Sequence, residues 1–157
     1  MLTSHQMSLQ SIKLYNQLAK KKLFQQKVNF NLQRIKTVLN LLKNPEKKLS
    51  NVVNIIGSDG KFSLLNSLKS FLEADGKKVS AFISPSLKDL RERFWMGDKF
   101  LSYKDINNSI REIENLKIPL TIFELFTVIY ILNASKKYND YHLIEAGALF
   151  AKDSTNV

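Results

Sequence analysis

The stretch from Asn51 to Ser63 constrains the fold more than any other part of this chain. It begins with an apolar, mostly β-branched run from Val52 to Ile56, which is typical of a buried strand in a parallel sheet. A glycine turn, residues 57–61, follows, and apolar residues then recur at helical spacing up to Leu72. A strand, a glycine turn and a helix carrying a lysine at its start form the context of a phosphate-binding loop. The sequence predicts such a loop, although its spacing departs from the usual Walker A motif because Phe62 separates Lys61 from Ser63.

Composition narrows the class of protein. A length of 157 residues suits one domain, and a hydrophobic content of 44% with ten phenylalanines excludes a disordered chain. The absence of cysteine excludes disulfides and thiolate metal sites. No apolar run reaches the roughly 18 residues of a membrane span, and no signal-peptide pattern opens the chain. We therefore expect a cytoplasmic protein without membrane association.

The net charge of +10 raises nucleic-acid binding as one interpretation. The lysines are spread along the chain, and only Lys20 to Lys22 form a run. No pattern of interleaved aromatic and arginine residues accompanies them. This distribution favours a solvated basic surface, and nucleic acid is not the expected partner.

The pattern along the chain predicts an α/β fold with a partial, parallel, phosphate-loop type of sheet and flanking helices. Residues 1–7 are expected to be a flexible start, residues 8–50 to form helices, with Asn31 as an N-cap, and residues 51–157 to form a βαβ core. Further strands are predicted at 78–84 and 141–145, helices at 103–116 and 119–137, and irregular structure from Pro85 through Trp95. Three strands are fewer than the usual five or six, which predicts a single truncated domain with an unfinished sheet edge near Glu145.

Four local patterns then occur in order. They are Gly57-Ser58-Asp59-Gly60-Lys61-Phe62-Ser63, Ser84-Pro85-Ser86-Leu87 with Glu92-Arg93, Leu120-Thr121-Ile122-Phe123-Glu124, and Ile144-Glu145-Ala146-Gly147 with Asp153-Ser154-Thr155-Asn156. Together they resemble the N-terminal part of folylpolyglutamate synthase and dihydrofolate synthase, of the Mur-ligase superfamily. The resemblance covers about residues 9 to 157.

The resemblance implies an ATP-binding domain of an ADP-forming ligase. Such enzymes join glutamate to a pteroate or folate carboxylate through an acyl phosphate, with ATP and Mg²⁺ as cofactors. The family extends well beyond the point that matches Val157. The resemblance therefore implies that this chain does not catalyse the reaction alone, and that a complementary chain would carry the missing C-terminal part.

The resemblance also assigns roles to individual residues. Lys61 matches the catalytic lysine that neutralises the ATP phosphates, which Ser58, Asp59, Gly60 and Ser63 would also contact. Ser84 and Glu124 match Mg²⁺ ligands, and Asn29, Phe30 and Asn31 match a substrate-binding segment. For Glu124, a carboxylate within an apolar helix is expected to be paired or coordinated. Glu145 fits equally a ligand contact at the carboxyl end of the sheet and a solvated strand end.

Several positions depart from the family pattern. Asp59 adds negative charge at the phosphate site, and Phe62 places a bulky side chain beside it. Ser86 replaces a histidine of the pattern, and residues 148–152 replace a glycine-rich loop. These departures predict weakened phosphate binding. They also support an alternative, a non-catalytic nucleotide-binding or protein-interaction module.

Overall fold

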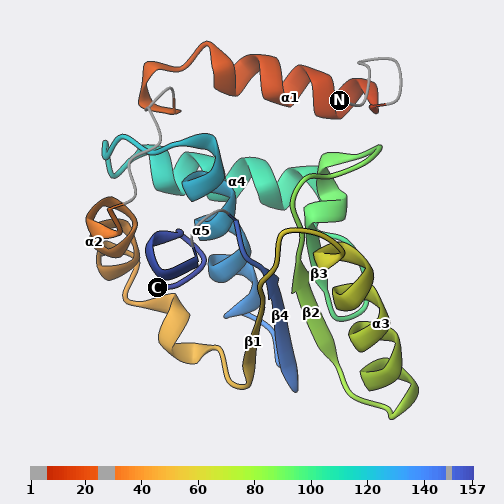
Figure 1. Ribbon diagram of the computed structural model, residues 1–157. Helices are drawn as coiled ribbons and strands as arrows, with labels where there is room; N and C mark the ends of the chain where they lie inside the picture. Colours follow the sequence, from red (N-terminus) through yellow and green to blue (C-terminus); the bar gives the residue numbers. More distant parts are fainter. Residues whose placement is uncertain (1–6, 25–30, 148–149) are drawn as a thin grey trace.

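A four-stranded sheet lies at the centre of the molecule (Figure 1). The computed structural model describes residues 7–24, 31–147 and 150–157. The strands are β1 (Val52–Ile55), β2 (Val79–Phe82), β3 (Phe94–Met96) and β4 (Tyr141–Glu145), in the spatial order β1-β4-β2-β3. β4 runs parallel to both β1 and β2, whereas β3 runs antiparallel to β2. The predicted α/β fold with a mostly parallel sheet is confirmed.

β3 is the strand that the sequence prediction misses, because it lies within the segment predicted to be irregular. Phe94 and Met96 are buried and Trp95 between them is half-buried, which is the alternation of a strand that packs mainly on one face. Trp95 also pairs with Phe100 across a short turn. A strand of three residues, directly preceded by Glu92 and Arg93, is too short for its periodicity to stand out in the sequence.

The strand order also corrects the predicted position of the open sheet edge. β4 ends at Glu145 and lies between β1 and β2, so Glu145 does not border an edge. The edge strands of the sheet are β1 and β3, and β1 is the parallel one of the two. Its Asn51 and Ile55 carbonyl groups accept hydrogen bonds from the β4 side, so the backbone polar groups of Asn54 face the other way. β4 enters between the first two strands only after two further helices, and local sequence patterns do not encode that placement.

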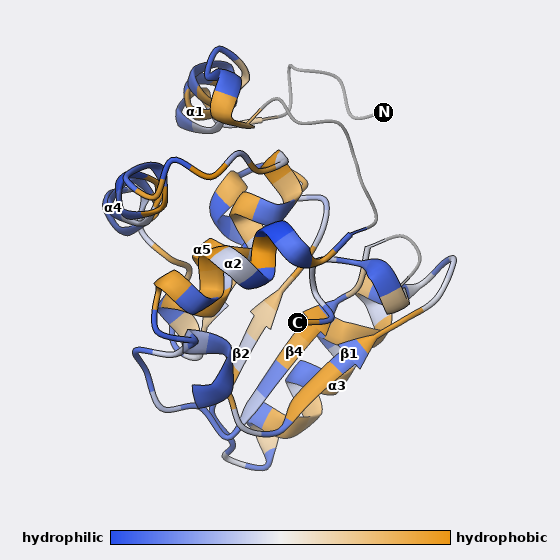
Figure 2. Cartoon of the chain, turned by 90° about the vertical axis from the view of Figure 1, so that its left-hand side faces the viewer, coloured by the Kyte–Doolittle hydropathy of each residue, from blue (hydrophilic) through white to orange (hydrophobic). Residues whose placement is uncertain are grey.

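Helices cover both faces of the sheet. The α-helices of the described residues are α1 (Leu9–Ala19), α2 (Gln33–Leu41), α3 (Lys61–Ala74), α4 (Tyr103–Glu114) and α5 (Ile122–Ala134). Short 3₁₀ segments span Lys22–Phe24, Pro45–Lys48, Leu90–Arg93 and Phe150–Lys152. α3 packs on one face, and α5 packs on the other, with α2 and α4 beyond it (Figures 1 and 2).

The ends of these helices follow local sequence signals. Gly76 follows the C-cap of α3 with a φ of 75°, because glycine adopts this left-handed conformation without strain. Ser102 caps α4 by accepting the backbone N–H of Asp105. The N-cap of α2 is Leu32, one residue later than predicted, and Asn31 Oδ1 instead accepts the Gln33 N–H at 2.8 Å. α5 is shorter than predicted.

The larger of the two apolar cores lies between the sheet and α5. Almost every residue of α5 is buried, which explains its lack of an amphipathic pattern. Phe82 of β2 stacks on Tyr130 of α5, with ring centroids 5.3 Å apart. A smaller core, which includes Ile55, Leu65 and Leu143, joins α3 to the opposite face.

A buried polar cluster bridges β2, β4 and α5. Ser80 Oγ lies 2.8 Å from the Tyr130 hydroxyl and 2.6 Å from His142 Nδ1. Burial lowers the pKa of His142 below its ordinary value of 6.5 and raises the pKa of Tyr130. The hydroxyl therefore joins a neutral imidazole to a neutral phenol within the core.

In the part of the chain that the structure describes, no helix is both long enough and apolar enough to cross a membrane.

Candidate functional site

The predicted phosphate loop joins β1 to α3, as the sequence indicated. Gly60 is the N-cap of α3 with a φ of 72°, a conformation that favours glycine, and no side chain caps this end. The first backbone hydrogen bond of the helix runs from the Leu64 N–H to the Gly60 carbonyl. The amides of Lys61, Phe62 and Ser63 are therefore left for a ligand, and the positive end of the helix dipole lies behind them.

Lys61 folds over the loop rather than extending into solvent. Its Nζ donates to the Gly57 carbonyl at 2.8 Å and lies 3.5 Å from the Ser58 carbonyl. Residues 57–60 are exposed, so an anion has access to the lysine and to the start of the helix. The structure thus brings together Ser58, Gly60 and Lys61, three of the predicted phosphate contacts. Asp59 is also exposed, and its carboxylate would lie close to any bound phosphate.

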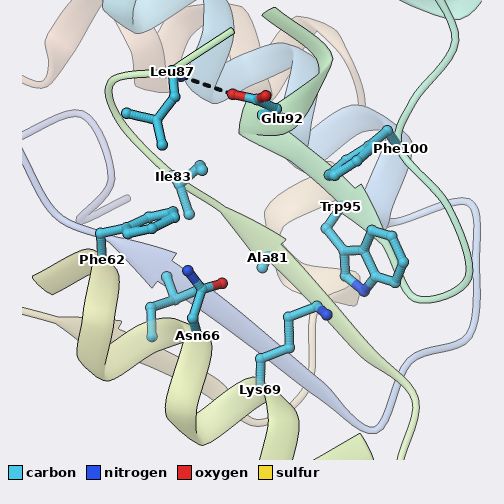
Figure 3. A pocket seen from close by; sticks show the side chains of 10 residues that line it. Phe62, Asn66, Lys69, Ala81, Ile83, Leu87, Glu92, Trp95 and Phe100 are labelled. Atoms are coloured by element: carbon cyan, nitrogen blue, oxygen red, sulfur yellow. Dashed lines mark hydrogen bonds between the residues drawn. The ribbon is translucent and has the colours of Figure 1, made fainter. Parts of the chain in front are cut away.

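Phe62 lies differently from what the sequence suggested. Its ring does not cover the loop; it lines a pocket on the flank of α3, together with Ile83 and Leu87 (Figure 3). The side chain is 39% exposed. The bulk of Phe62 therefore adds to this neighbouring pocket and leaves the amides at the helix start accessible.

Ser84 and Glu145 come together where two parallel strands end. Ser84 follows β2 and Glu145 closes β4, and the Ser84 N–H donates to Glu145 Oε2 at 2.9 Å. Arg93 Nη1 donates to Ser84 Oγ at 2.9 Å. Arg93 is buried over the ring of Phe126, and its Nε has no hydrogen-bond partner among the described residues. The sequence pattern includes Arg93 but did not indicate this contact.

Glu124 has protein partners for both of its carboxylate oxygens. Oε2 accepts the Thr121 N–H at 2.7 Å, and the Thr121 hydroxyl accepts the Glu124 N–H at 3.1 Å, which is a complete capping box at the start of α5. Arg34 of α2 lies 3.2 Å from both carboxylate oxygens through its Nη2. The expectation that this buried carboxylate is paired is confirmed. The Thr-x-x-Glu spacing is a readable capping signal that sequence analysis overlooked.

The predicted Mg²⁺ ligands can be tested against these contacts. A serine hydroxyl and a carboxylate are hard oxygen donors, as Mg²⁺ requires. Yet Ser84 Oγ is occupied by Arg93, and Glu124 is occupied by Arg34 and a backbone amide. The described residues contain no group of three or more His, Asp or Glu side chains that could hold a metal ion. As arranged, Ser84 and Glu124 hold protein groups, and their metal role stays a prediction.

The remaining predicted segments have mainly structural contacts. Asp153 is buried, and its Oδ1 accepts both the N–H and the hydroxyl of Thr155, at 2.9 and 2.6 Å. A Cβ at Gly147 would lie 2.3 Å from Asp153 Oδ2, so the close approach of this turn requires glycine. Of the predicted substrate segment, Asn31 accepts the Gln33 N–H just before α2, and Asn29 and Phe30 lie outside the described residues, as do residues 148 and 149 of the altered loop.

The fold and the site define an α/β protein with an exposed glycine loop, a lysine and a helix start at the end of its first strand. The chain is a homologue of folylpolyglutamate and dihydrofolate synthases that spans about a third of the length of those enzymes. It is 28% identical to folylpolyglutamate synthase of Lacticaseibacillus casei over 134 residues, which is 80% of this chain and 31% of that protein.

Solved structures agree with this assignment. E. coli FolC in complex with DHPP and ADP matches with a TM-score of 0.83 and 27% identity over 92% of this chain and 35% of its own. The bifunctional folylpolyglutamate/dihydrofolate synthase of Yersinia pestis, complexed with AMPPNP and a Mn ion, matches with a TM-score of 0.82 and 26% identity, with coverage of 92% and 35%. A scan against protein-family models finds no match.

Proposed function

We propose that this chain is the phosphate-binding portion of a ligase that joins glutamate to a pteroate or folate carboxylate. The observation that carries the proposal is the position of Lys61, folded over an exposed loop in front of the unpaired amides at the start of α3. Homologous structures hold ADP, or AMPPNP with Mn. In this chain Lys61, Gly60 and the amides up to Ser63 would bind the ATP phosphates, with the Ser58 and Ser63 hydroxyls beside them.

The chemistry of the proposed reaction defines what these residues would do. An oxygen of the substrate carboxylate attacks the γ-phosphorus, the bond to ADP breaks, and an acyl phosphate forms. The glutamate amine then attacks the acyl carbon, loses a proton, and displaces phosphate. Catalysis of such transfers consists mainly of positioning and of neutralising charge. The ammonium of Lys61 and the backbone N–H groups beside it would supply both for the transferred phosphate.

We propose further that a complementary polypeptide completes the catalytic site. The chain spans about a third of the homologous enzymes, and the outer edge of β1 has no strand beside it among the described residues. Val52 and Ile56, at the two ends of this edge, are 41% and 58% exposed. An exposed sheet edge with apolar side chains is usually covered by further polypeptide. The complementary part would carry the glutamate site.

One observation favours a second candidate, a non-catalytic nucleotide-binding or protein-interaction module. Arg34 already neutralises Glu124, so Mg²⁺ could reach that carboxylate only if α2 released it. A module that binds nucleotide through the loop alone would respond to ATP equally with and without Mg²⁺. A ligase portion would bind the metal complex more tightly, because the metal would add its own contacts.

Calorimetric titration with Mg-ATP tests the phosphate site. We expect weak binding by the wild-type chain, in the millimolar range, and none by Lys61→Ala. Asp59→Asn should raise the affinity about fivefold, because a unit charge about 4 Å from a phosphate costs roughly 1 kcal/mol in water. Asp75→Asn, at the far end of α3, is the matched control and should change nothing. Micromolar binding that Lys61→Ala abolishes would show that the site is intact and that the weakening predicted from Asp59 is wrong.

A further inference from the structure

A pocket of about 290 Å³ lies on the α3 side of the sheet, beside the start of that helix (Figure 3). α3 forms one wall through Phe62 and Asn66, and Trp95 and Phe100 form the opposite wall. Ala81 of β2 and Ile83, which directly follows this strand, also line the pocket. Flat, apolar walls of this kind suit an aromatic ring, and the volume corresponds to a small ligand, near the lower limit of about 300 Å³ for such sites.

The two charged side chains that line this pocket, Lys69 and Glu92, both have protein partners. Lys69 Nζ lies 2.9 Å from Glu73 Oε2 and 4.2 Å from the centroid of the Trp95 ring. Glu92 Oε2 accepts the backbone N–H groups of Leu87 and Lys88, at 2.7 and 3.0 Å. An anionic ligand would therefore lose its water without gaining a free cation, because Lys69 is already paired with Glu73 and Glu92 adds a negative charge. The pocket disfavours an anion, and its aromatic and aliphatic lining favours an uncharged ring.

Asn66 is the uncharged polar side chain of the pocket that is free to recognise a ligand. The Trp95 indole N–H donates to Glu73 Oε1 at 3.0 Å, so the tryptophan offers only the face of its ring. Asn66 lies on α3 between Phe62 and Lys69, with its carboxamide directed into the pocket (Figure 3). Within the described part of the chain, this carboxamide makes no hydrogen bond. It leaves one donor and one acceptor side by side for a ligand.

We propose that this pocket binds a neutral, planar aromatic molecule that carries an amide-type donor and acceptor at one edge. The ring would lie between Phe62 and Trp95, and the amide edge would pair with the Asn66 carboxamide. This site is separate from the phosphate loop, since Lys61 Nζ bonds to the Gly57 carbonyl and does not line the pocket. It is also separate from Glu124, which lies on α5 across the sheet.

The single tryptophan of the chain makes the proposal testable by ¹H–¹⁵N NMR, because the Trp95 indole gives one resolved signal. The probe is benzamide. Benzoate has the same shape with a negative charge, and acetophenone has the same shape without the amide donor. We expect benzamide to shift the Trp95 indole signal and the Asn66 side-chain signals along one saturating curve. Acetophenone should bind more weakly, and benzoate weakest.

Two variants decide which residue recognises the ligand. Asn66→Leu keeps the approximate size of the side chain and removes its hydrogen-bonding groups, and should weaken benzamide binding about 3- to 10-fold, the range expected for lost hydrogen bonds. Asn108→Leu, on an exposed position of α4, is the matched control and should leave the affinity unchanged. Lys61→Ala should also leave it unchanged. The proposal is overturned if benzamide produces no shift, if benzoate binds as well as benzamide, if Asn66→Leu has no effect, or if Lys61→Ala abolishes binding.

Discussion

The glycine loop and the start of α5 are two segments of the same family pattern, yet they are built in opposite ways. Residues 57–60 are exposed, and Lys61 is bonded only to backbone carbonyl groups of its own loop. Glu124 is 6% exposed and is bonded to Thr121 and to Arg34 of another helix. The loop can exchange its contacts for a ligand at small cost, whereas α5 cannot. Residues that share a motif can therefore differ in how far the fold depends on them.

The largest effect should follow from removing the carboxylate in α5. Glu124→Ala leaves the Thr121 N–H uncapped and the Arg34 guanidinium without a partner, and should lower the free energy of unfolding by about 2–4 kcal/mol. Urea denaturation measures this change. Glu112→Ala is the matched control, since Glu112 is exposed and lies 4.0 Å from Lys136, and should cost less than about 0.5 kcal/mol. If the two variants lost the same free energy of unfolding, Glu124 would not be more important for the fold than an exposed carboxylate, and the contrast between α5 and the glycine loop would be wrong.

A second large loss of stability should follow from a change in the buried polar cluster of Ser80, Tyr130 and His142. Ser80→Ala leaves both the Tyr130 hydroxyl and His142 Nδ1 without their shared partner, which should cost about 1–3 kcal/mol. Ser70→Ala, at an exposed position of α3, should be nearly neutral. Thermal or urea unfolding of the two variants gives the comparison. If Ser80→Ala left the free energy of unfolding unchanged, the hydrogen bonds among the three polar groups would not stabilise the fold.

The same cluster predicts a pH dependence with a defined sign. Burial lowers the pKa of His142 in the folded chain below 6.5, so the unfolded chain binds this proton first as the pH falls. The contribution of neutral His142 to the free energy of unfolding is therefore complete above pH 6.5. Below that pH it declines, by at most about 1.4 kcal/mol per pH unit for one proton. Urea midpoints measured from pH 7.5 to 5.5 report this decline. His142→Gln should flatten the profile in that range, and an unchanged slope in the variant would contradict the assignment.

The smallest effect on stability should come from the loop. Lys61→Ala removes one exposed hydrogen bond to Gly57, and the free energy of unfolding should change by less than about 0.5 kcal/mol. The same urea titration measures it, with the wild-type chain as reference. A loss above about 1 kcal/mol would show that Lys61 holds the loop together and is not free to serve a ligand.

The sequence predicted the local elements better than their arrangement. The run of β-branched residues before Gly57 and the apolar face of α3 are local patterns, so β1, the loop and α3 were predicted correctly. β3 was missed because three residues carry too little periodicity. The insertion of β4 between β1 and β2 depends on tertiary packing, which no local pattern encodes.

In the candidate site too, local features were predictable from the sequence and long-range contacts were not. The positions of Lys61 and of the loop glycines were predictable because they depend on residues next to each other in the chain. The pairing of Glu124 with Arg34 was not, because 90 residues separate them and either side chain alone fits several roles. The pocket beside Trp95 required the same long-range information, since α3 and β3 supply its two walls.

The central claim is that the loop is open to phosphate while Glu124 and Ser84 are held by protein groups. The most direct measurement is a ¹H–¹⁵N NMR titration with ATP, first with EDTA and then with Mg²⁺. We predict amide shifts confined to residues 57–64 in both steps, with the signals of Ser84, Thr121 and Glu124 unchanged. Shifts at those three residues on addition of Mg²⁺ would show that the metal displaces Arg34 and Arg93, and would contradict the claim.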